Sequence, residues 1–210
     1  MKLNKIPKII VITGSIGTGK STAVNIIKEM GFKVLDSDKI VHEGYNIGNT
    51  LYNKVVKHFG KEILNKDNTI DRQKLGQIVF NDKVKLIFLN NLVHNSVVEE
   101  LIKGINECED EVIFLDIPLI LEVKEKNEFY DLKFDEIWLI YVNEQTQRER
   151  LWKRAIIENK NPDDVLKIIS KQISIEEKVS MVDEVINNEG TVEELEQKIQ
   201  ELLKTKGIRW

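Results

Sequence analysis

Residues 14–21 read Gly14-Ser15-Ile16-Gly17-Thr18-Gly19-Lys20-Ser21 and fit the pattern G-x-x-x-x-G-K-[ST] at every fixed position. The preceding residues, 8–14, form a β-branched apolar run that ends in glycine, which predicts a buried strand. Residues 20–30 follow helical spacing and stop at Gly31, a residue typical of the end of a helix. This order of strand, glycine-rich loop and helix predicts a phosphate-binding loop.

The residue types of this loop suit a nucleoside triphosphate. Glycines let backbone N–H groups turn inward around an anion without clashes from Cβ atoms, and the positive end of the following helix points at the same phosphates. Lys20 is expected to reach the β- and γ-phosphates, and the Ser21 hydroxyl to bind Mg²⁺. A glycine-rich turn with a chance lysine is the alternative, but it explains neither the strand nor the helix. The residues expected to bind the nucleotide are Gly14, Gly17, Thr18, Gly19, Lys20, Ser21 and Thr22.

Further apolar runs predict four more strands, at residues 32–36, 111–116, 137–142 and 184–187. Helical segments separate these runs, and buried strands that alternate with helices are typical of a parallel sheet covered on both faces. Residues 191–206 predict a final amphipathic helix, with Thr191 as N-cap and Glu194 completing a capping box. We therefore expect an α/β fold: a P-loop NTPase core with a five-stranded parallel sheet flanked by helices.

Two stretches are too long for simple connecting helices. Residues 39–110 contain several helical patterns and no good strand, which indicates a helical insertion after the second strand. Residues 145–180 are helical and highly charged, with Asn159-Lys160-Asn161-Pro162 as an internal break. We expect one domain of 210 residues, in which the insertion (about 39–110) holds an acceptor and the second stretch (about 145–180) closes as a lid. The core comprises about residues 1–38, 111–144 and 181–210.

The composition narrows the classes of function. The 31 Lys and Arg residues against 35 Asp and Glu residues give a net charge of −4, which argues against a dedicated nucleic-acid binder. Cys108 is the single cysteine, so a disulfide framework is excluded and a reducing cytoplasm fits. No run approaches the roughly 20 apolar residues of a membrane span. We expect a cytoplasmic protein, with Trp138 in the sheet and Trp152 packed in the core.

A small P-loop chain with such an insertion suits a phosphoryl-transfer kinase. A switch GTPase would carry Asn-Lys-x-Asp after a later strand, whereas Asn65-Lys66-Asp67-Asn68 has its Asp one position early and follows no strand. A recombinase or motor ATPase usually has a larger core. A nucleotide-switched binding protein with slow hydrolysis is the alternative from another class.

Asp36-Ser37-Asp38 follows the second strand, near the edge where ligands of open α/β sheets bind. The two carboxylates point the same way on an extended segment, so one of them can face an acceptor hydroxyl and accept its proton. The alternative is that Asp38 is the N-cap of a helix that begins at Lys39. From the residues alone, both interpretations stay open.

Asp116 ends the apolar run 112–115, which is the Walker B pattern, and its carboxylate could hold Mg²⁺ through water. The alternative is a polar residue that merely ends a strand.

Arg150 and Arg154 are four residues apart, close to Arg148 in the same predicted helix, and share a helical face that could clamp a transferring phosphoryl group. The alternative for these arginines is a solvated face that pairs with Glu144, Glu149 and Glu158.

With these residues assembled, the chain resembles the dephospho-CoA kinase family almost from end to end. Residues 13–22 are similar to the family's T-G-G-I-G-S-G-K-S-T, and Asp36-Ser37-Asp38 to its D-A-D. The other matching motifs are Phe59-Gly60; Ile70-Asp71-Arg72, Leu75 and Val79-Phe80; Asp116-Ile117-Pro118-Leu119-Ile120-Leu121-Glu122; Gln147, Arg150, Leu151 and Arg154; Gln172; Lys178; and residues 183–190.

This resemblance implies transfer of the ATP γ-phosphate to the ribose 3′-hydroxyl of 3′-dephospho-CoA, the last step of CoA synthesis. ATP is the phosphoryl donor of this reaction, and Mg²⁺ is expected from the Ser21 hydroxyl and from phosphate chemistry. From charge and hydropathy we expect no nucleic-acid or membrane partner, and we expect a monomer or weak homo-oligomer. Asp38 corresponds to the base and Arg154 to the lid arginine, which makes Asp38, Lys20, Arg150 and Arg154 the expected catalytic residues. Asn188 is expected to help bind the nucleotide, and Ser21 and Asp116 to hold the metal.

Three positions depart from the family pattern. Ser15 replaces a customary Gly at a variable position of the loop, and Asn187 stands where Asp is usual. His94-Asn95 replaces the usual His-Pro, which relaxes the backbone restriction on His94. A kinase for another small alcohol, such as a nucleoside or a sugar, would share the loop and differ in its acceptor.

Overall fold

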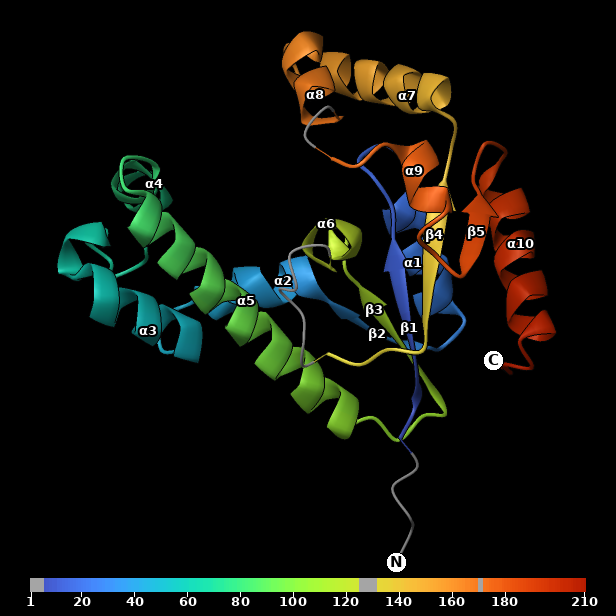
Figure 1. Cartoon of the computed structure of the whole chain (residues 1–210), viewed down its shortest axis with the longest axis horizontal. Coiled ribbons are helices and arrows are strands. Elements are labelled where there is room, and N and C mark those ends of the chain that lie inside the picture. Colours follow the sequence, from blue (N-terminus) through green and yellow to red (C-terminus); the bar gives the residue numbers. More distant parts are fainter. Residues whose placement is uncertain (1–5, 125–131, 170–171) are drawn as a thin grey trace, which may run out of the picture. The chain divides into compact units, whose positions relative to one another are not determined.

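The computed structural model describes residues 6–124, 132–169 and 172–210. The chain forms two compact units (Figure 1). The first, here called the sheet unit, comprises Met1–Leu35 and Glu107–Trp210. The second, the helical unit, comprises Asp36–Asn106.

A five-stranded sheet forms the centre of the sheet unit, with strand order β2-β3-β1-β4-β5. β1 pairs in parallel with both β3 and β4, and β4 pairs in parallel with β5. Each observed strand lies within one or two residues of its predicted position, so the predicted α/β P-loop fold is confirmed. The strand bounds are β1 Lys8–Thr13, β2 Lys33–Asp36, β3 Val112–Asp116, β4 Glu136–Tyr141 and β5 Glu184–Asn187.

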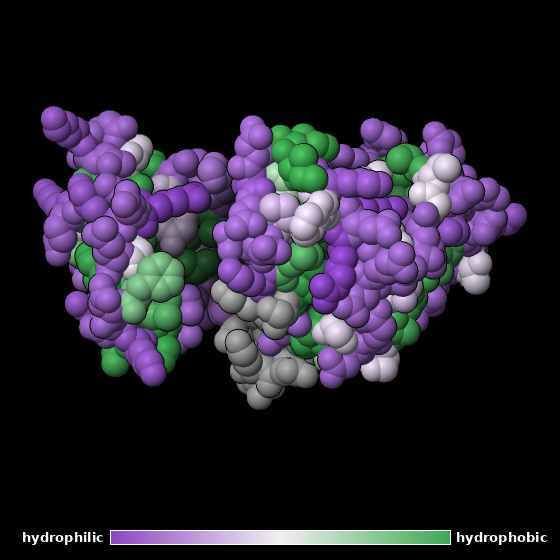
Figure 2. Space-filling model, turned by 90° about the horizontal axis from the view of Figure 1, so that it is seen from above, coloured by the Kyte–Doolittle hydropathy of each residue, from purple (hydrophilic) through white to green (hydrophobic). Residues whose placement is uncertain are grey.

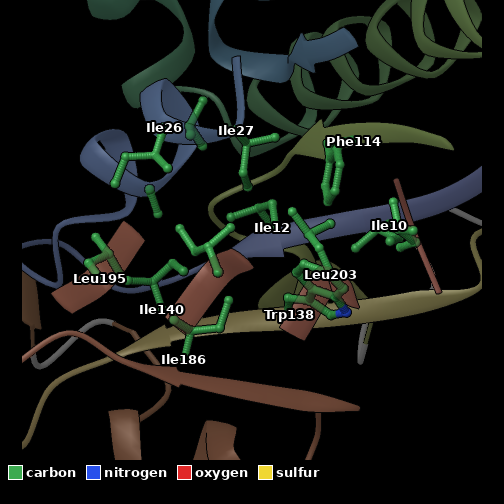
Figure 3. Packing of buried hydrophobic residues seen from close by; sticks show 14 of the residues in the cluster. Ile10, Ile12, Ile26, Ile27, Phe114, Trp138, Ile140, Ile186, Leu195 and Leu203 are labelled. Carbon is green, nitrogen blue, oxygen red and sulfur yellow. The ribbon is translucent and has the colours of Figure 1, made fainter. Parts of the chain in front are cut away.

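Helices α1 (Lys20–Glu29) and α10 (Val192–Thr205) cover one face of the sheet. Figure 3 shows side chains of β1, β3, β4 and β5 meeting those of the two helices in one apolar cluster. Trp138 lies fully buried in this cluster, as predicted. Full burial of each such large apolar side chain contributes about 1.5–3 kcal/mol, so this packing fixes the position of the loop between β1 and α1. The labelled members are Ile10, Ile12, Ile26, Ile27, Phe114, Trp138, Ile140, Ile186, Leu195 and Leu203.

The last helix begins as its sequence predicts. The Thr191 side chain accepts a hydrogen bond from the backbone N–H of Glu194, and the Glu194 side chain accepts one from the backbone N–H of Thr191. This capping box satisfies two of the donors that every helix leaves without an internal partner. Lys198 then donates to the Asn187 carbonyl at 2.9 Å, which ties α10 to the end of β5.

The short helix α6 (Ile120–Lys124) follows β3. In the described part of the chain between β4 and β5 lie the helices α7 (Glu144–Ile157), α8 (Pro162–Ile169) and α9 (Ile175–Val179). Pro162 opens α8, and Asn159 adopts a positive φ of 51° just before it, so the predicted break lies where the sequence indicates. α7 and α8 pack side by side (Figure 1). Trp152 of α7 remains 46% exposed, so the prediction that it packs in the core is wrong. Figure 2 looks onto this end of the unit and shows scattered apolar areas on a largely hydrophilic surface.

The helical unit consists of α2 (Ser37–Gly44), α3 (Thr50–Phe59), a 3₁₀ turn η1 (Lys61–Ile63), α4 (Arg72–Phe80) and α5 (Lys83–Asn106). α5 packs against α2, α3 and α4. The unit has a core of its own, formed by Leu51, Val55, Phe59, Ile63, Leu75, Val79 and Leu89. No helix in the described part of the chain is both long and apolar enough to span a membrane.

Candidate active site

The loop between β1 and α1 has the backbone of a phosphate-binding loop. Gly17 and Gly19 have φ angles of +86° and +85°, which residues with a Cβ rarely adopt. A Cβ on Gly19 would also lie 2.2 Å from Nδ2 of Asn188, and one on Gly17 would lie 2.8 Å from Cγ of Leu151. The two glycines are therefore required both by backbone conformation and by close packing.

Thr18 stabilises the loop through its buried hydroxyl. Its side chain is fully buried, and its Oγ1 donates a hydrogen bond of 2.9 Å to the Ser15 carbonyl. A Cβ on Gly14 would come within 2.7 Å of that hydroxyl. The Thr18 side chain is thus committed to the loop itself, whereas the Lys20 and Ser21 side chains follow at the start of α1.

Lys20 and Asp116 lie in contact. Nζ of Lys20 donates a hydrogen bond to Oδ1 of Asp116 at the end of β3, and both side chains are largely buried. The parallel register pairs Asp116, the last residue of β3, with Ile12 near the end of β1. Asp116 therefore lies at the carboxyl edge of the sheet, where the loop that leads to Lys20 begins. The structure thus brings together the Lys20 ammonium, which is expected at the γ-phosphate, and the Asp116 carboxylate, which is expected near the metal.

The start of α1 suits an anion. Gly19 is its N-cap in the left-handed conformation, and the helix, described in full, carries no acidic residue in its first turn. Ser21 is exposed at the second helical position, and Thr22 follows it half-buried. The first N–H groups of a helix have no partner within the helix, so they can bind a phosphate. Among the described residues, no group of three or more His, Cys, Asp or Glu side chains could hold a metal ion by itself.

Arg150 and Asn188 meet at the loop. The Arg150 guanidinium donates a hydrogen bond of 2.8 Å to the Asn188 carbonyl and lies 3.7 Å from the Cβ position of Gly19. The Asn188 amide in turn donates a hydrogen bond of 2.8 Å to the Thr18 carbonyl. Arg150 therefore lies beside Gly19 of the loop, and the Asn188 side chain supports the loop backbone.

The other two arginines of α7 form surface ion pairs. Arg154 is 62% exposed and pairs with Glu158 at 2.6 Å, and Arg148 pairs with Glu144 at 2.8 Å. Hydrogen bonds from Lys160 and Arg154 lower the pKa of Glu158 to about 2. The solvated-face alternative therefore holds for Arg148 and Arg154 in this conformation, and Arg150 is the arginine that reaches the loop.

Three further polar side chains hold the loop, and the sequence assigned them no role. Gln147 of α7 donates a hydrogen bond of 2.7 Å to the Ile16 carbonyl, and the Gln172 side-chain oxygen accepts a longer one of 3.4 Å from the Ile16 amide. Lys178 of α9 donates one of 3.0 Å to Oγ of Ser15. The signal available in the sequence was their occurrence at family motif positions, and the structure adds that Gln147 and Lys178 are buried.

Asp38 lies in the helical unit, at the start of α2. Asp36, not Asp38, is the N-cap: its carboxylate accepts a hydrogen bond of 2.9 Å from the Lys39 amide, so the capping alternative for Asp38 is wrong. Asp38 is exposed, and its carboxylate forms no hydrogen bond or ion pair with any residue that the structure describes. A base needs such an uncommitted carboxylate.

The same helix carries His42, one turn beyond Asp38 and therefore on the same side. Nη2 of Arg72 lies 3.2 Å from Nδ1 of His42, and its guanidinium lies 5.6 Å from the centroid of the Tyr45 ring. Burial raises the pKa of Tyr45, although the charge of Arg72 opposes that shift. These groups border a pocket of about 310 Å³ within the helical unit, which is completed by Asn46, Ile47, Thr69 and Ile70.

Comparison with known proteins gives one consistent family. A sequence model of the family described as dephospho-CoA kinase matches residues 8–194. The dephospho-CoA kinase of Carboxydothermus hydrogenoformans is 40% identical over 199 residues, which cover 93% of each chain. That of Aquifex aeolicus is 37% identical over 196 residues, which cover 93% of this chain and 95% of the other.

Solved structures agree with these matches. A crystal structure of a Thermus thermophilus protein superposes with a TM-score of 0.76 at 27% identity, covering 96% of this chain and 98% of the other. The dephospho-CoA kinase from Campylobacter jejuni superposes with a TM-score of 0.62 at 26% identity, covering 95% of this chain and 97% of the other. The similarity therefore extends over both units.

Proposed function

This chain belongs to the dephospho-CoA kinase family, and we propose that it transfers the γ-phosphoryl group of ATP to the ribose 3′-hydroxyl of 3′-dephospho-CoA. The products are CoA and ADP, so the chain is a phosphotransferase of CoA biosynthesis with an alcohol group as acceptor. The contact between Lys20 and Asp116 beside a phosphate-binding loop is the structural observation that carries this proposal.

The loop residues bind the triphosphate of ATP. Backbone N–H groups around Gly17 and Gly19 and the start of α1 surround the phosphates, and the Lys20 ammonium neutralises charge on the β- and γ-phosphates. In phosphoryl transfer the charge spreads over the γ-phosphoryl oxygens in the transition state, where a fixed cation stabilises it most. Lys20 is therefore assigned a catalytic as well as a binding role.

Ser21 and Asp116 would hold Mg²⁺. Their hydroxyl and carboxylate oxygens are the hard donors that Mg²⁺ prefers, and this ion is commonly bound by one or two protein oxygens together with substrate phosphates. Asp116 follows directly from β3 and is largely buried, so its carboxylate is held in a fixed position. Bound Mg²⁺ supplies charge neutralisation on the β- and γ-phosphoryl oxygens.

Asp38 serves as the base. It accepts the proton of the acceptor hydroxyl while the hydroxyl oxygen forms its bond to the γ-phosphorus and the bond to the bridging oxygen of ADP breaks. Its exposure and its lack of partners among the described residues support this role.

The helical unit binds the acceptor. The side of α2 that carries Asp38 also carries His42, which adjoins Arg72 and the pocket of about 310 Å³. The diphosphate of 3′-dephospho-CoA is negatively charged, so a guanidinium at this position suits it. Residues about 39–110 are accordingly the acceptor-binding insertion of a single kinase domain.

Residues about 145–180 act as the lid. Arg150 lies beside Gly19, and we assign it to the transferring phosphoryl group together with Arg154, which would exchange its pairing with Glu158 for the phosphates on closure. Closure of such a segment keeps water away from the γ-phosphate. A cytoplasmic location fits the single cysteine. A monomer or weak homo-oligomer fits a chain that acts on small-molecule substrates.

An ADP-release assay with a panel of acceptors tests the proposal. With ATP and Mg²⁺, we expect 3′-dephospho-CoA to stimulate ADP release strongly and nucleosides and sugars to have little effect, with Lys20→Ala as an inactive control. Stimulation by another alcohol alone would leave a P-loop kinase with a different acceptor. Slow release that no acceptor changes would favour a nucleotide-switched binding protein.

A further inference from the structure

We infer that Lys178 is a positioning residue for the phosphate-binding loop: anchored by Glu122, its buried ammonium holds the Ser15 hydroxyl and so maintains the loop conformation that binds ATP. The inference depends on the proposed function only in that ATP is the ligand of the loop. It does not depend on the identity of the acceptor.

Three segments that are distant in the sequence meet at this lysine. Lys178 lies on α9 with its side chain 0% exposed. Its Nζ donates a hydrogen bond of 3.0 Å to Oγ of Ser15, in the loop after β1, and lies 2.8 Å from Oε1 of Glu122, on α6 after β3. The ammonium therefore links the loop to two helices of the sheet unit.

The charge balance makes Lys178 and Glu122 interdependent. Both carboxylate oxygens of Glu122 are buried and have no partner with hydrogen-bond geometry among the described residues, so the ammonium is their compensating charge. Removing one member of a buried pair leaves an uncompensated charge, whereas replacing both members by neutral groups is often tolerated. The stability of the fold therefore does not by itself require an ion pair at this position. The distinct contribution of Lys178 is a charged hydrogen-bond donor to the Ser15 hydroxyl.

Ser15 transmits this contact to the loop backbone. Its carbonyl accepts the Thr18 hydroxyl at 2.9 Å while its own hydroxyl accepts from Lys178, so the residue is fixed at both ends. The glycines on either side, Gly14 and Gly17, impose little conformational restriction of their own. The loop conformation therefore depends on such contacts, of which the one from Lys178 is charge-assisted and hence stronger than a neutral hydrogen bond.

Lys178 is distinguished from Lys20 by its burial. Lys20 reaches the edge of the sheet where phosphates bind, whereas Lys178 is enclosed between Ser15 and Glu122. A residue in that position acts on ATP through Ser15 and does not touch the phosphates. Its removal should weaken ATP binding without changing the affinity for the acceptor.

Direct binding of ATP to purified variants tests the inference, with the KM for the acceptor as a second readout. Lys178→Met should raise the Kd for ATP about tenfold or more, as expected for loss of a hydrogen bond from a charged donor, and leave the acceptor KM unchanged. Ser15→Ala, which removes only the acceptor of that hydrogen bond, should raise the Kd by a smaller factor. The double variant Ser15→Ala with Lys178→Met should bind ATP no more weakly than Lys178→Met, because both substitutions remove the same hydrogen bond.

Two further variants keep the test decisive. Lys178→Met with Glu122→Gln removes the uncompensated charge, so it should fold, as monitored by its thermal unfolding midpoint, and still bind ATP weakly. Lys206→Met is the matched control, because Lys206 is also paired, with Glu136 and Glu184 at the first residues of β4 and β5 and far from the loop. It should leave the Kd for ATP unchanged. Normal ATP binding by the folded neutral double variant, or additive effects of Ser15→Ala and Lys178→Met, would overturn the inference.

Discussion

The Asn188 side chain lies directly against Gly19: its amide nitrogen donates a hydrogen bond of 2.8 Å to the Thr18 carbonyl and occupies the space within 2.2 Å of where a Gly19 Cβ would be. The segment after β5 is thereby packed against the phosphate-binding loop. Arg150 then donates to the Asn188 carbonyl, so the same asparagine connects the loop to α7. The loop conformation is consequently set by residues that are more than a hundred positions away in the sequence.

Gly19→Ala should abolish measurable ATP binding. The substitution combines an unfavourable positive φ with a clash against Asn188, and both effects act at the loop itself. Gly31→Ala is the matched control, because Gly31 also has a positive φ of +92° but nothing lies within 4 Å of its Cβ position. We expect it to cost about 1–2 kcal/mol of stability and to leave the Kd for ATP unchanged. Retained ATP affinity in Gly19→Ala would contradict the described loop geometry.

Asp38→Asn should keep ATP binding and lose turnover. A positioned base contributes about 10²–10⁴-fold to the rate, so we expect kcat to fall by that order while the Kd for ATP stays the same. Glu43→Gln removes an exposed carboxylate from the same helix and should leave kcat normal. Near-normal turnover of Asp38→Asn would remove the assignment of Asp38 as the base.

Arg150→Ala should lower kcat by about 10²–10³-fold, as expected for loss of one charged donor to a transferring group. Arg154→Ala should also lower kcat, because we assign Arg154 to the closed lid. We expect a smaller effect than for Arg150→Ala, because Arg154 must first give up its ion pair with Glu158. Arg148→Ala, which breaks only the surface pair with Glu144, is the control and should retain full activity. Single-turnover rates of the three variants measure these effects, and equal rates for Arg148→Ala and Arg150→Ala would refute the assignment.

Glu136 makes the stability of the sheet unit depend on pH. Burial alone would raise its pKa, but hydrogen bonds from Lys8, Trp138 and Lys206 lower the pKa to about 2, against an ordinary value of 4.5. Because the pKa of the folded state is the lower one, the stabilisation is fully present above pH 4.5 and is lost as the pH falls from 4.5 towards 2. At about 1.4 kcal/mol for each pKa unit this stabilisation is at most about 3.5 kcal/mol at neutral pH, and solvent screening of the partly exposed carboxylate reduces it below that limit.

Urea unfolding of Glu136→Gln and of the unmodified chain at pH 7 and pH 3 measures this contribution. The difference in free energy of unfolding between the two proteins should be larger at pH 7 than at pH 3. Glu158→Gln provides a comparison, because Glu158 also has a pKa of about 2 but lies at the C-cap of α7, where solvent screens its charge. A difference for Glu136→Gln that stays constant with pH would show that its carboxylate does not titrate in this way.

Local patterns in the sequence predicted most of the fold. The strands are short apolar runs rich in β-branched and aromatic residues, and their length and composition favour a strand over a helical segment. The start of α10 was predictable because the Thr191–Glu194 capping box involves residues only three apart. The phosphate-binding loop was predictable for the same reason, since all its fixed positions lie within eight residues.

Features that depend on long-range packing were not predictable. The helical spacing of α7 places Trp152 on one side of the helix but cannot show whether another element covers that side, and it remains exposed. Asp36 and Asp38 are both good N-caps, and the choice between them depends on a helix boundary that differs by only two residues. The burial of Lys178 arises from contact with Ser15 across 163 positions, so no local pattern could reveal it.

Locating the transferred phosphoryl group tests the central assignment most directly. The chain would be incubated with 3′-dephospho-CoA, Mg²⁺ and ATP labelled in its γ-phosphate, with Lys20→Ala in parallel, and the labelled products would be separated and identified. We predict that the label appears in the ribose 3′-phosphate of CoA, and that Lys20→Ala gives none. Label found only in inorganic phosphate, or in a compound other than CoA, would contradict the assignment.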